Sequence, residues 1–133
     1  MADVSSSVET LVRSVLILED SPIIALDMEQ IVFDMGADFV WSCRTCEEAF
    51  AALASNEFQF ALLDIHLGSQ NSLPVAAHLV RSKTPFLFVT GSSSLAGEVL
   101  ELPDVPRLSK PFVQRQLIAA ITEFSRGTRL KAA

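Results

Sequence analysis

The chain is poor in cysteine, in basic residues and in long apolar runs, and each shortage excludes a class of protein. Its 133 residues include two cysteines, too few for a disulfide scaffold. Lysine and arginine number 10 against 16 acidic residues, a net charge of −6, and they form no cluster, so direct binding to nucleic acid is not expected. The longest apolar run, residues 49–54, has six residues, whereas a membrane-spanning helix needs about 20. Because the first residues also lack the regions of a secretory signal, we expect a cytoplasmic protein that contacts no membrane.

Half of the residues are hydrophobic, which is too many for intrinsic disorder. A chain of this length fits one domain and buries roughly two-thirds of its unfolded surface. We expect a flexible tail over residues 1–13, one folded domain over residues 14–127 and a C-terminal tail over residues 128–133. From this division we expect no separate output domain.

Short apolar runs alternate along the chain with longer segments of helical periodicity. Four of the runs are almost continuously apolar, as expected for strands covered on both faces. A fifth is short and contains a proline, which favours the edge of a sheet. The five predicted strands are residues 15–19, 38–42, 60–64, 85–89 and 105–108.

Helix start signals precede the segments between these strands. Residues with side chains that can cap a helix stand at three of the expected starts, namely Ser21, Thr45 and Ser72. The last helix is expected to begin near Val113, and a short or mobile helix is expected within residues 91–104. Alternating strands and helices with short loops predict a parallel sheet covered on both sides. Five strands favour the flavodoxin-like doubly wound α/β fold with strand order 2-1-3-4-5.

Charged and polar residues stand at the carboxyl ends of four predicted strands. Glu19 and Asp20 follow the first strand, Asp64 the third, Thr90 the fourth and Lys110 the fifth. The carboxyl ends of parallel strands meet at one edge of the sheet, so these five side chains should converge. Converging carboxylates repel one another unless a cation binds them. Mg²⁺ is the natural occupant because it takes oxygen ligands from one or two carboxylates plus a phosphate.

A carboxylate beside Mg²⁺ can also attack a phosphoryl group and form an aspartyl phosphate. Thr90 and Lys110 would then supply a hydrogen bond and a positive charge to the phosphoryl oxygens, and such positioning is most of what phosphoryl transfer requires of a protein. The residues alone therefore predict a Mg²⁺-dependent site that handles phosphate.

From about Val15 to Phe124 the sequence resembles the receiver domain of two-component response regulators. The spacing of 44 residues between Asp20 and Asp64 is typical of that family. The matching motifs are LILED at 16–20, FALLDIHL at 60–67, FLFVTG at 86–91 and LSKPF at 108–112.

The resemblance implies a role for each site residue. Asp64 would be the phosphoacceptor, and Thr90 and Lys110 would contact the phosphoryl group. Mg²⁺ would be held by Asp20, by Asp64 and by the backbone carbonyl of His66, while Glu19 would act through water. The peptide bond between Lys110 and Pro111 would be cis.

The resemblance also implies partners. A sensor histidine kinase or a phosphotransfer protein would supply the phosphoryl group. A downstream protein would read the face formed by the fourth helix, the fifth strand and the last helix. Such a bacterial stand-alone receiver would be a monomer or weak homodimer, and it would catalyse only its own phosphorylation and dephosphorylation.

Three departures from the family and two alternatives accompany this interpretation. The loop after Asp64 is compact and lacks the pattern usual in the family. Arg107 occupies the position where the family usually has an aromatic switch residue, and only 20 residues separate Thr90 from Lys110. A pseudo-receiver that keeps the fold and never takes phosphate is one alternative. The other is a dithiol oxidoreductase that uses Cys43 and Cys46, a C-x-x-C pair between a strand and a helix.

Overall fold

A computed structural model describes residues 12–91 and 107–132 of the chain. Within these residues, five parallel strands form one sheet in the order β2-β1-β3-β6-β7. This order is the one predicted for the flavodoxin-like doubly wound fold, and β7, the shortest strand of this sheet, lies at an edge as expected. The strands are β1 (Ser14–Leu18), β2 (Phe39–Cys43), β3 (Phe60–Leu63), β6 (Phe86–Thr90) and β7 (Arg107–Ser109).

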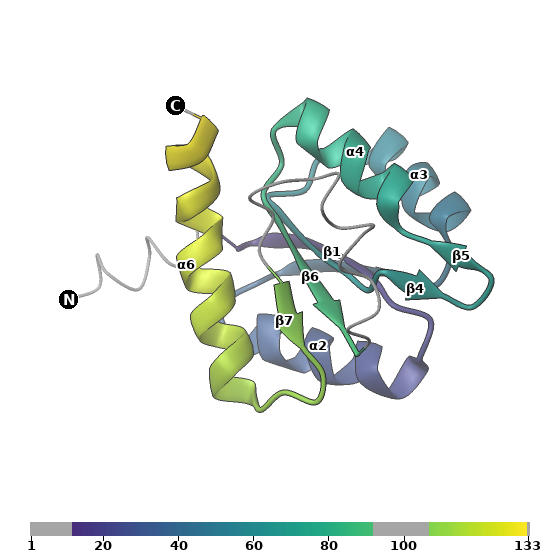
Figure 1. Cartoon of the computed structure of the whole chain (residues 1–133). Helices are drawn as coiled ribbons and strands as arrows, with labels where there is room; N and C mark the ends of the chain where they lie inside the picture. The colour runs from purple at the N-terminus through teal and green to yellow at the C-terminus, as the bar shows by residue number, and fades with distance from the viewer. Residues whose placement is uncertain (1–11, 92–106, 133) are drawn as a thin grey trace.

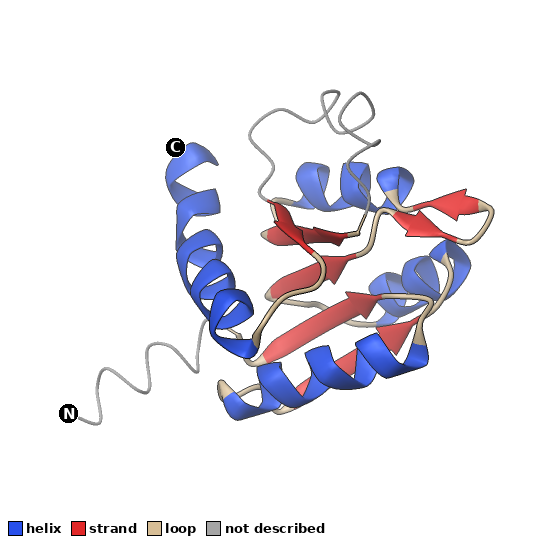
Figure 2. Cartoon of the chain, turned by 60° about the horizontal axis from the view of Figure 1, so that its bottom comes forward, coloured by secondary structure: helices blue, strands red, loops and turns tan. Residues whose placement is uncertain are grey.

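Helices cover both faces of the sheet (Figure 1). Helices α2 (Pro22–Asp34) and α6 (Gln114–Ala132) pack on one face, and α3 (Cys46–Ser55) and α4 (Leu73–Ser82) pack on the other (Figure 2). Each face has its own core. On the first, Met28 of α2 and Leu117 of α6 meet the buried strand residues, and on the second Ala49 of α3 and Leu79 of α4 do so. The inner strands β1, β3 and β6 are thus buried between two apolar layers, which explains why they are almost continuously apolar in sequence. The run at residues 38–42 was also expected to be covered on both faces, but β2 lies at an edge and is partly exposed.

The predicted helix starts are confirmed in position. Ser21 Oγ accepts a hydrogen bond from the backbone N–H of Ile24, and Thr45 Oγ1 accepts one from that of Glu48. Helix α4 begins after Ser72, but the hydroxyl of Ser72 makes no capping bond. The side chain of Asn71 caps this helix instead, because its Oδ1 accepts a hydrogen bond of 3.0 Å from the backbone N–H of Leu73.

A small hairpin follows Asp64 and was not predicted from the sequence. Strands β4 (His66–Leu67) and β5 (Gln70–Asn71) pair in antiparallel orientation around a two-residue turn. Gly68, the first turn residue, has a φ of +67°, a conformation that side chains with a Cβ rarely adopt. Glycine at that position is typical of a tight hairpin turn.

The described secondary structure and contacts extend beyond the expected boundaries of the domain, by contacts at the N-terminal end and by the length of a helix at the C-terminal end. Val12, which was expected in the tail, is only 1% exposed, and Arg13 forms an ion pair of 2.7 Å with Asp38. Helix α6 continues to Ala132, through residues expected to be a C-terminal tail. The helix begins at Gln114, close to the expected start near Val113, and the apolar side chain of Val113 is 55% exposed.

Two expectations lie outside the described residues. These are the flexibility of residues 1–11 and the helix expected within residues 91–104. Where the structure is described, none of its helices has the length and apolarity needed to cross a membrane.

Candidate functional site

The backbone fixes two of the acidic residues firmly in the sheet. Glu19 follows β1 directly, and its N–H donates a 2.9 Å hydrogen bond to the carbonyl of Cys43 in β2. Asp64 follows β3, and its N–H donates a 2.9 Å hydrogen bond to the carbonyl of Leu18 in β1. The pairing between strands therefore continues into the acidic residues themselves. Their positions depend on the sheet and not on a loop.

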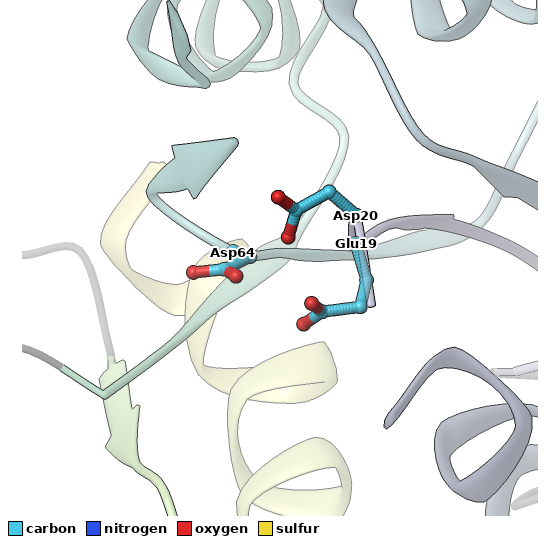
Figure 3. A group of neighbouring side chains, drawn as sticks. All are labelled: Glu19, Asp20 and Asp64. Atoms are coloured by element: carbon cyan, nitrogen blue, oxygen red, sulfur yellow. The ribbon is translucent and has the colours of Figure 1, made fainter. Parts of the chain in front are cut away.

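Three carboxylates come together at this edge of the sheet. Glu19, Asp20 and Asp64 each offer an oxygen atom, and these atoms all lie within 4.8 Å of one another. Figure 3 shows the side chains of Glu19 and Asp20 extending from neighbouring positions toward that of Asp64. Glu19 is 1% exposed and Asp64 6% exposed, whereas Asp20 is half-buried. The predicted convergence of the acidic residues is therefore present in the structure.

Lys110 joins this cluster from the chain that follows β7. Its Nζ donates hydrogen bonds of 2.8 Å to Glu19 Oε1 and 3.0 Å to Asp64 Oδ2. The peptide bond that connects Lys110 to Pro111 is cis, as the resemblance implied. A single half-buried ammonium group thus pairs with two buried carboxylates from two different strands.

Burial and charge shift the pKa of two groups in the cluster. Burial raises the pKa of Glu19, and the hydrogen bond from Lys110 only partly opposes this effect. For Lys110, burial lowers the pKa, but the hydrogen bonds to Glu19 and Asp64 and the charges of these carboxylates outweigh burial, so the net pKa is raised. The arrangement therefore favours a charged lysine.

The oxygen atoms that remain free suit a hard divalent cation. Both oxygens of Glu19 are engaged, Oε1 by Lys110 and Oε2 by the backbone N–H of Ser21 at 3.0 Å. Within the described part of the chain, neither the carboxylate of Asp20 nor Oδ1 of Asp64 accepts a hydrogen bond. Three carboxylates and one ammonium carry a formal charge of −2, which a divalent cation would neutralise. The donor set therefore fits Mg²⁺, which prefers oxygen ligands.

The structure describes the positions of Thr90 and His66, the other two predicted site residues, in their strands. Thr90 ends β6 and pairs in register with Ser109 of β7, so its backbone lies beside the residue that precedes Lys110. The side chain of Thr90 lies outside the described atoms. His66 is the first residue of β4, two positions after Asp64, and its side chain is exposed.

Two neighbours of the site were missed by the sequence analysis. The backbone N–H of Ser21 holds Glu19, although Ser21 was considered only as a helix cap. Gly91 packs beside the lysine, because a Cβ added to it would lie 3.7 Å from Lys110 Cβ. Their positions next to predicted site residues were the only sequence signals available.

The two cysteines do not have the properties of a reactive dithiol. Cys43 and Cys46 are buried free thiols. Burial, followed by the charge of Glu48, raises the pKa of Cys43 to about 12, and burial also raises the pKa of Cys46. A catalytic dithiol needs an exposed sulfur of lowered pKa, so these observations oppose the oxidoreductase alternative.

Comparison with known proteins agrees with this geometry. Residues 15–122 match the family model described as the response regulator receiver domain. The chain is 24% identical over 119 residues to the transcriptional regulatory protein LytR of Staphylococcus aureus, a match that covers 87% of this chain and 48% of the relative. It spans about half the length of the curated relatives it matches.

Two solved structures extend the comparison. A CheY-like response regulator receiver domain protein from Methanospirillum hungatei has a TM-score of 0.76 and 27% identity, with 90% of this chain and 98% of that chain covered. SdrG from Sphingomonas melonis has a TM-score of 0.72 and 31% identity, with 84% and 97% covered.

Proposed function

Because the chain belongs to the response regulator receiver domain family, we propose that it is a phosphorylation-controlled switch whose phosphoacceptor is Asp64. The observation that carries this proposal is the arrangement around Asp64. One of its oxygens is held by Lys110, the other accepts no hydrogen bond from the described residues, and two further carboxylates lie within 4.8 Å of Asp64. We propose that the protein acts in cytoplasmic signalling and is not a metabolic enzyme.

The phosphoryl group would come from a phosphohistidine on a sensor histidine kinase or a phosphotransfer protein. A carboxylate oxygen of Asp64 attacks the phosphorus and forms a P–O bond. The P–N bond to the histidine breaks, and its electron pair stays on the imidazole nitrogen. Lys110, already within 3.0 Å of Asp64 Oδ2, then offers its ammonium group to the phosphoryl oxygens. This is positioning and charge stabilisation, which dominates phosphoryl transfer.

Asp20, Asp64 and the backbone carbonyl of His66 would hold Mg²⁺ at this site. When bound, Mg²⁺ supplies positive charge that draws the phosphoryl oxygens toward the carboxylate cluster. Glu19 would act through water, because its two oxygens already accept hydrogen bonds from Lys110 and Ser21. Glu19 also holds Lys110 beside the acceptor.

Phosphorylation would change the charge and hydrogen bonding at the ends of β6 and β7. The phosphoryl group adds negative charge and three acceptor oxygens at Asp64. Thr90 ends β6, and Lys110 follows β7, the neighbouring strand. Their movement toward the phosphoryl group would alter the surface that a downstream partner reads. Arg107 is exposed on β7, so we propose that this surface presents a cation where the family usually has an aromatic residue.

Treatment with Mg²⁺ and acetyl phosphate tests the proposal. The intact protein should gain the mass of one phosphoryl group, and its amide NMR signals near Asp64 should shift. Asp64→Asn should abolish both responses. Asp27→Asn, which changes an exposed carboxylate on α2, should leave them unchanged.

Beryllofluoride provides a second readout, because it mimics an acyl phosphate without a transfer step. If neither reagent changes the wild-type spectrum at millimolar Mg²⁺, the switch proposal is wrong and the chain is a pseudo-receiver.

The oligomeric state is tested separately by sedimentation. A weak homodimer would have an apparent mass that increases with protein concentration, and a monomer would not.

A further inference from the structure

A cavity of about 360 Å³ lies beside the edge strand β2, where it meets helix α3. It shares no lining residue with the site around Asp64. Its size falls within the range of ligand sites in proteins. Its lining consists of an aromatic ring, one carboxylate and small or polar side chains, from Trp41, Glu48, Ala51, Ala52, Ser55 and Asn56.

One wall of the cavity is the only tryptophan of the sequence. Trp41 lies on β2 and is 45% exposed. It contacts Phe39 with a distance of 5.9 Å between ring centroids, and Phe39 in turn stacks on Phe58 at 5.7 Å. This row of three aromatic rings supports the indole from one side. The indole thus remains half exposed beside a hollow.

The one charged group among the residues that line the cavity is the carboxylate of Glu48. Glu48 forms no ion pair with any described residue, and its Oε1 accepts a 2.7 Å hydrogen bond from the backbone N–H of Arg44. Ser55 and Asn56 mark the C-terminal end of α3, which has no basic residue in its last turn. A helix C-terminus carries a partial negative charge. Glu48 lies in the first turn of α3 and lines the cavity together with Trp41, so its carboxylate and the indole face both attract a cation. The C-terminal end of the helix lies about 10 Å farther along its axis and adds only a weaker, more distant attraction.

Arginine matches this combination better than other side chains. Its planar guanidinium stacks on an indole and donates hydrogen bonds to a carboxylate at the same time. Ala51 and Ala52 leave space for the aliphatic part of the side chain along α3. Among the residues that the structure describes, the edge strand β2 beside the cavity has a sheet partner on one side only, so an extended peptide can lie along its other side.

We propose that this cavity binds an arginine side chain presented by a basic segment of a partner protein. A second copy of this chain is a poor occupant, because each copy carries a net charge of −6 and like charges repel. The proposal does not depend on phosphorylation of Asp64.

Trp41 makes the test direct, because all indole fluorescence of the full chain comes from the wall of the cavity. The probe is the peptide acetyl-Ala-Ala-Arg-Ala-Ala-amide, titrated at low ionic strength. Its matched control replaces arginine by citrulline, which keeps the shape and removes the charge. We expect saturable changes in emission with the arginine peptide, weakened by added salt, and at least about threefold weaker binding of the citrulline peptide.

Two variants locate the binding site. Glu48→Gln keeps an oxygen that can accept the bond from Arg44 and removes the charge, so it should weaken the arginine peptide at least about threefold. Glu47→Gln makes the same charge change at an exposed neighbour outside the cavity and should leave binding unchanged. Trp41→Leu removes the fluorophore, so binding of the arginine peptide to this variant is followed by the amide NMR shifts of Ala51 and Ala52. These shifts should show that the variant, like Glu48→Gln, binds the peptide more weakly.

Three results would overturn the proposal. The first is equal binding of the arginine and citrulline peptides. The second is an equal effect of Glu47→Gln and Glu48→Gln, which would assign the interaction to net charge alone. The third is self-association of the wild-type chain that Trp41→Leu abolishes, since the occupant would then be a second copy.

Discussion

The ammonium nitrogen of Lys110 lies 2.8 Å from Oε1 of Glu19, although 91 positions separate the two residues in the chain. The same nitrogen lies 3.0 Å from Oδ2 of Asp64. One side chain therefore connects the ends of β1 and β3 with the segment that follows β7. Because both carboxylates are buried, the connection has consequences for stability as well as for phosphate chemistry.

We expect Lys110→Met to destabilise the fold at neutral pH. The substitution leaves Glu19 and Asp64 without their cation in a buried setting, and breaking a buried ion pair costs on the order of 3 kcal/mol. Urea denaturation measures the free energy of unfolding. Arg81→Met is the matched control, because it removes a positive charge from an exposed position on α4. An equal loss in both variants would show that Lys110 contributes only net charge.

Asp20→Asn should have opposite effects without and with Mg²⁺. In EDTA the substitution removes repulsion from Glu19 and Asp64, so it should raise the melting temperature slightly. Millimolar Mg²⁺ should stabilise the wild type, by about 1.4 kcal/mol at tenfold the dissociation constant, and should no longer stabilise the variant. Thermal unfolding with and without Mg²⁺ measures both effects. Asp27→Asn should keep the full response to Mg²⁺.

Both thiols should resist alkylation in the folded protein. The pKa of Cys43 is raised to about 12, so its thiolate is scarce at pH 8, whereas an unfolded thiol ionises near pH 8.5. Iodoacetamide should therefore modify the native protein slowly and the urea-unfolded protein rapidly. Because the unfolded state loses this proton first, stability should fall as the pH rises from about 8.5 toward 12. Fast native labelling of Cys43 at pH 8 would contradict the raised pKa.

The exposed apolar residues at the start of α2 should take part in docking of the protein phosphodonor. Ile23 and Leu26 are 77% and 64% exposed and follow Asp20 closely in the chain. Ile23→Ser with Leu26→Ser should slow phosphorylation by a phosphohistidine protein and leave phosphorylation by acetyl phosphate unchanged. Phe33→Ser is the control, because Phe33 is 47% exposed but lies about 15 Å from Ile23 along the helix. Equal slowing with both donors would indicate a defect in the site itself.

The sheet and the acidic site were predictable because both depend on features that are local in the sequence. Four nearly continuous apolar runs marked strands, three of them buried, and the order of strands then determined which strand ends meet. Once that order was predicted, Glu19, Asp20, Asp64 and Lys110 had to converge. The burial of Lys110 between two carboxylates and the engagement of both Glu19 oxygens were not predictable, because they depend on side-chain geometry.

The hairpin after Asp64 shows where sequence patterns are too short to be informative. Its strands have two residues each, so no alternation of apolar and polar residues can appear. Gly68 with Ser69 was the available sign of a tight turn. The exposure of Val113 was missed for a related reason, since a single apolar residue at a helix start fits either face.

The backbone bonds of Glu19 and Asp64 determine how long the acidic cluster keeps its geometry. Both N–H groups donate to carbonyls of neighbouring strands, so neither residue can leave its place without opening of the central sheet. In hydrogen exchange, these two amides should open with the free energy of global unfolding. If exchange shows this, the proposed phosphoacceptor Asp64 would belong to the part of the molecule that unfolds last, and the loops and helices around it could move without displacing it.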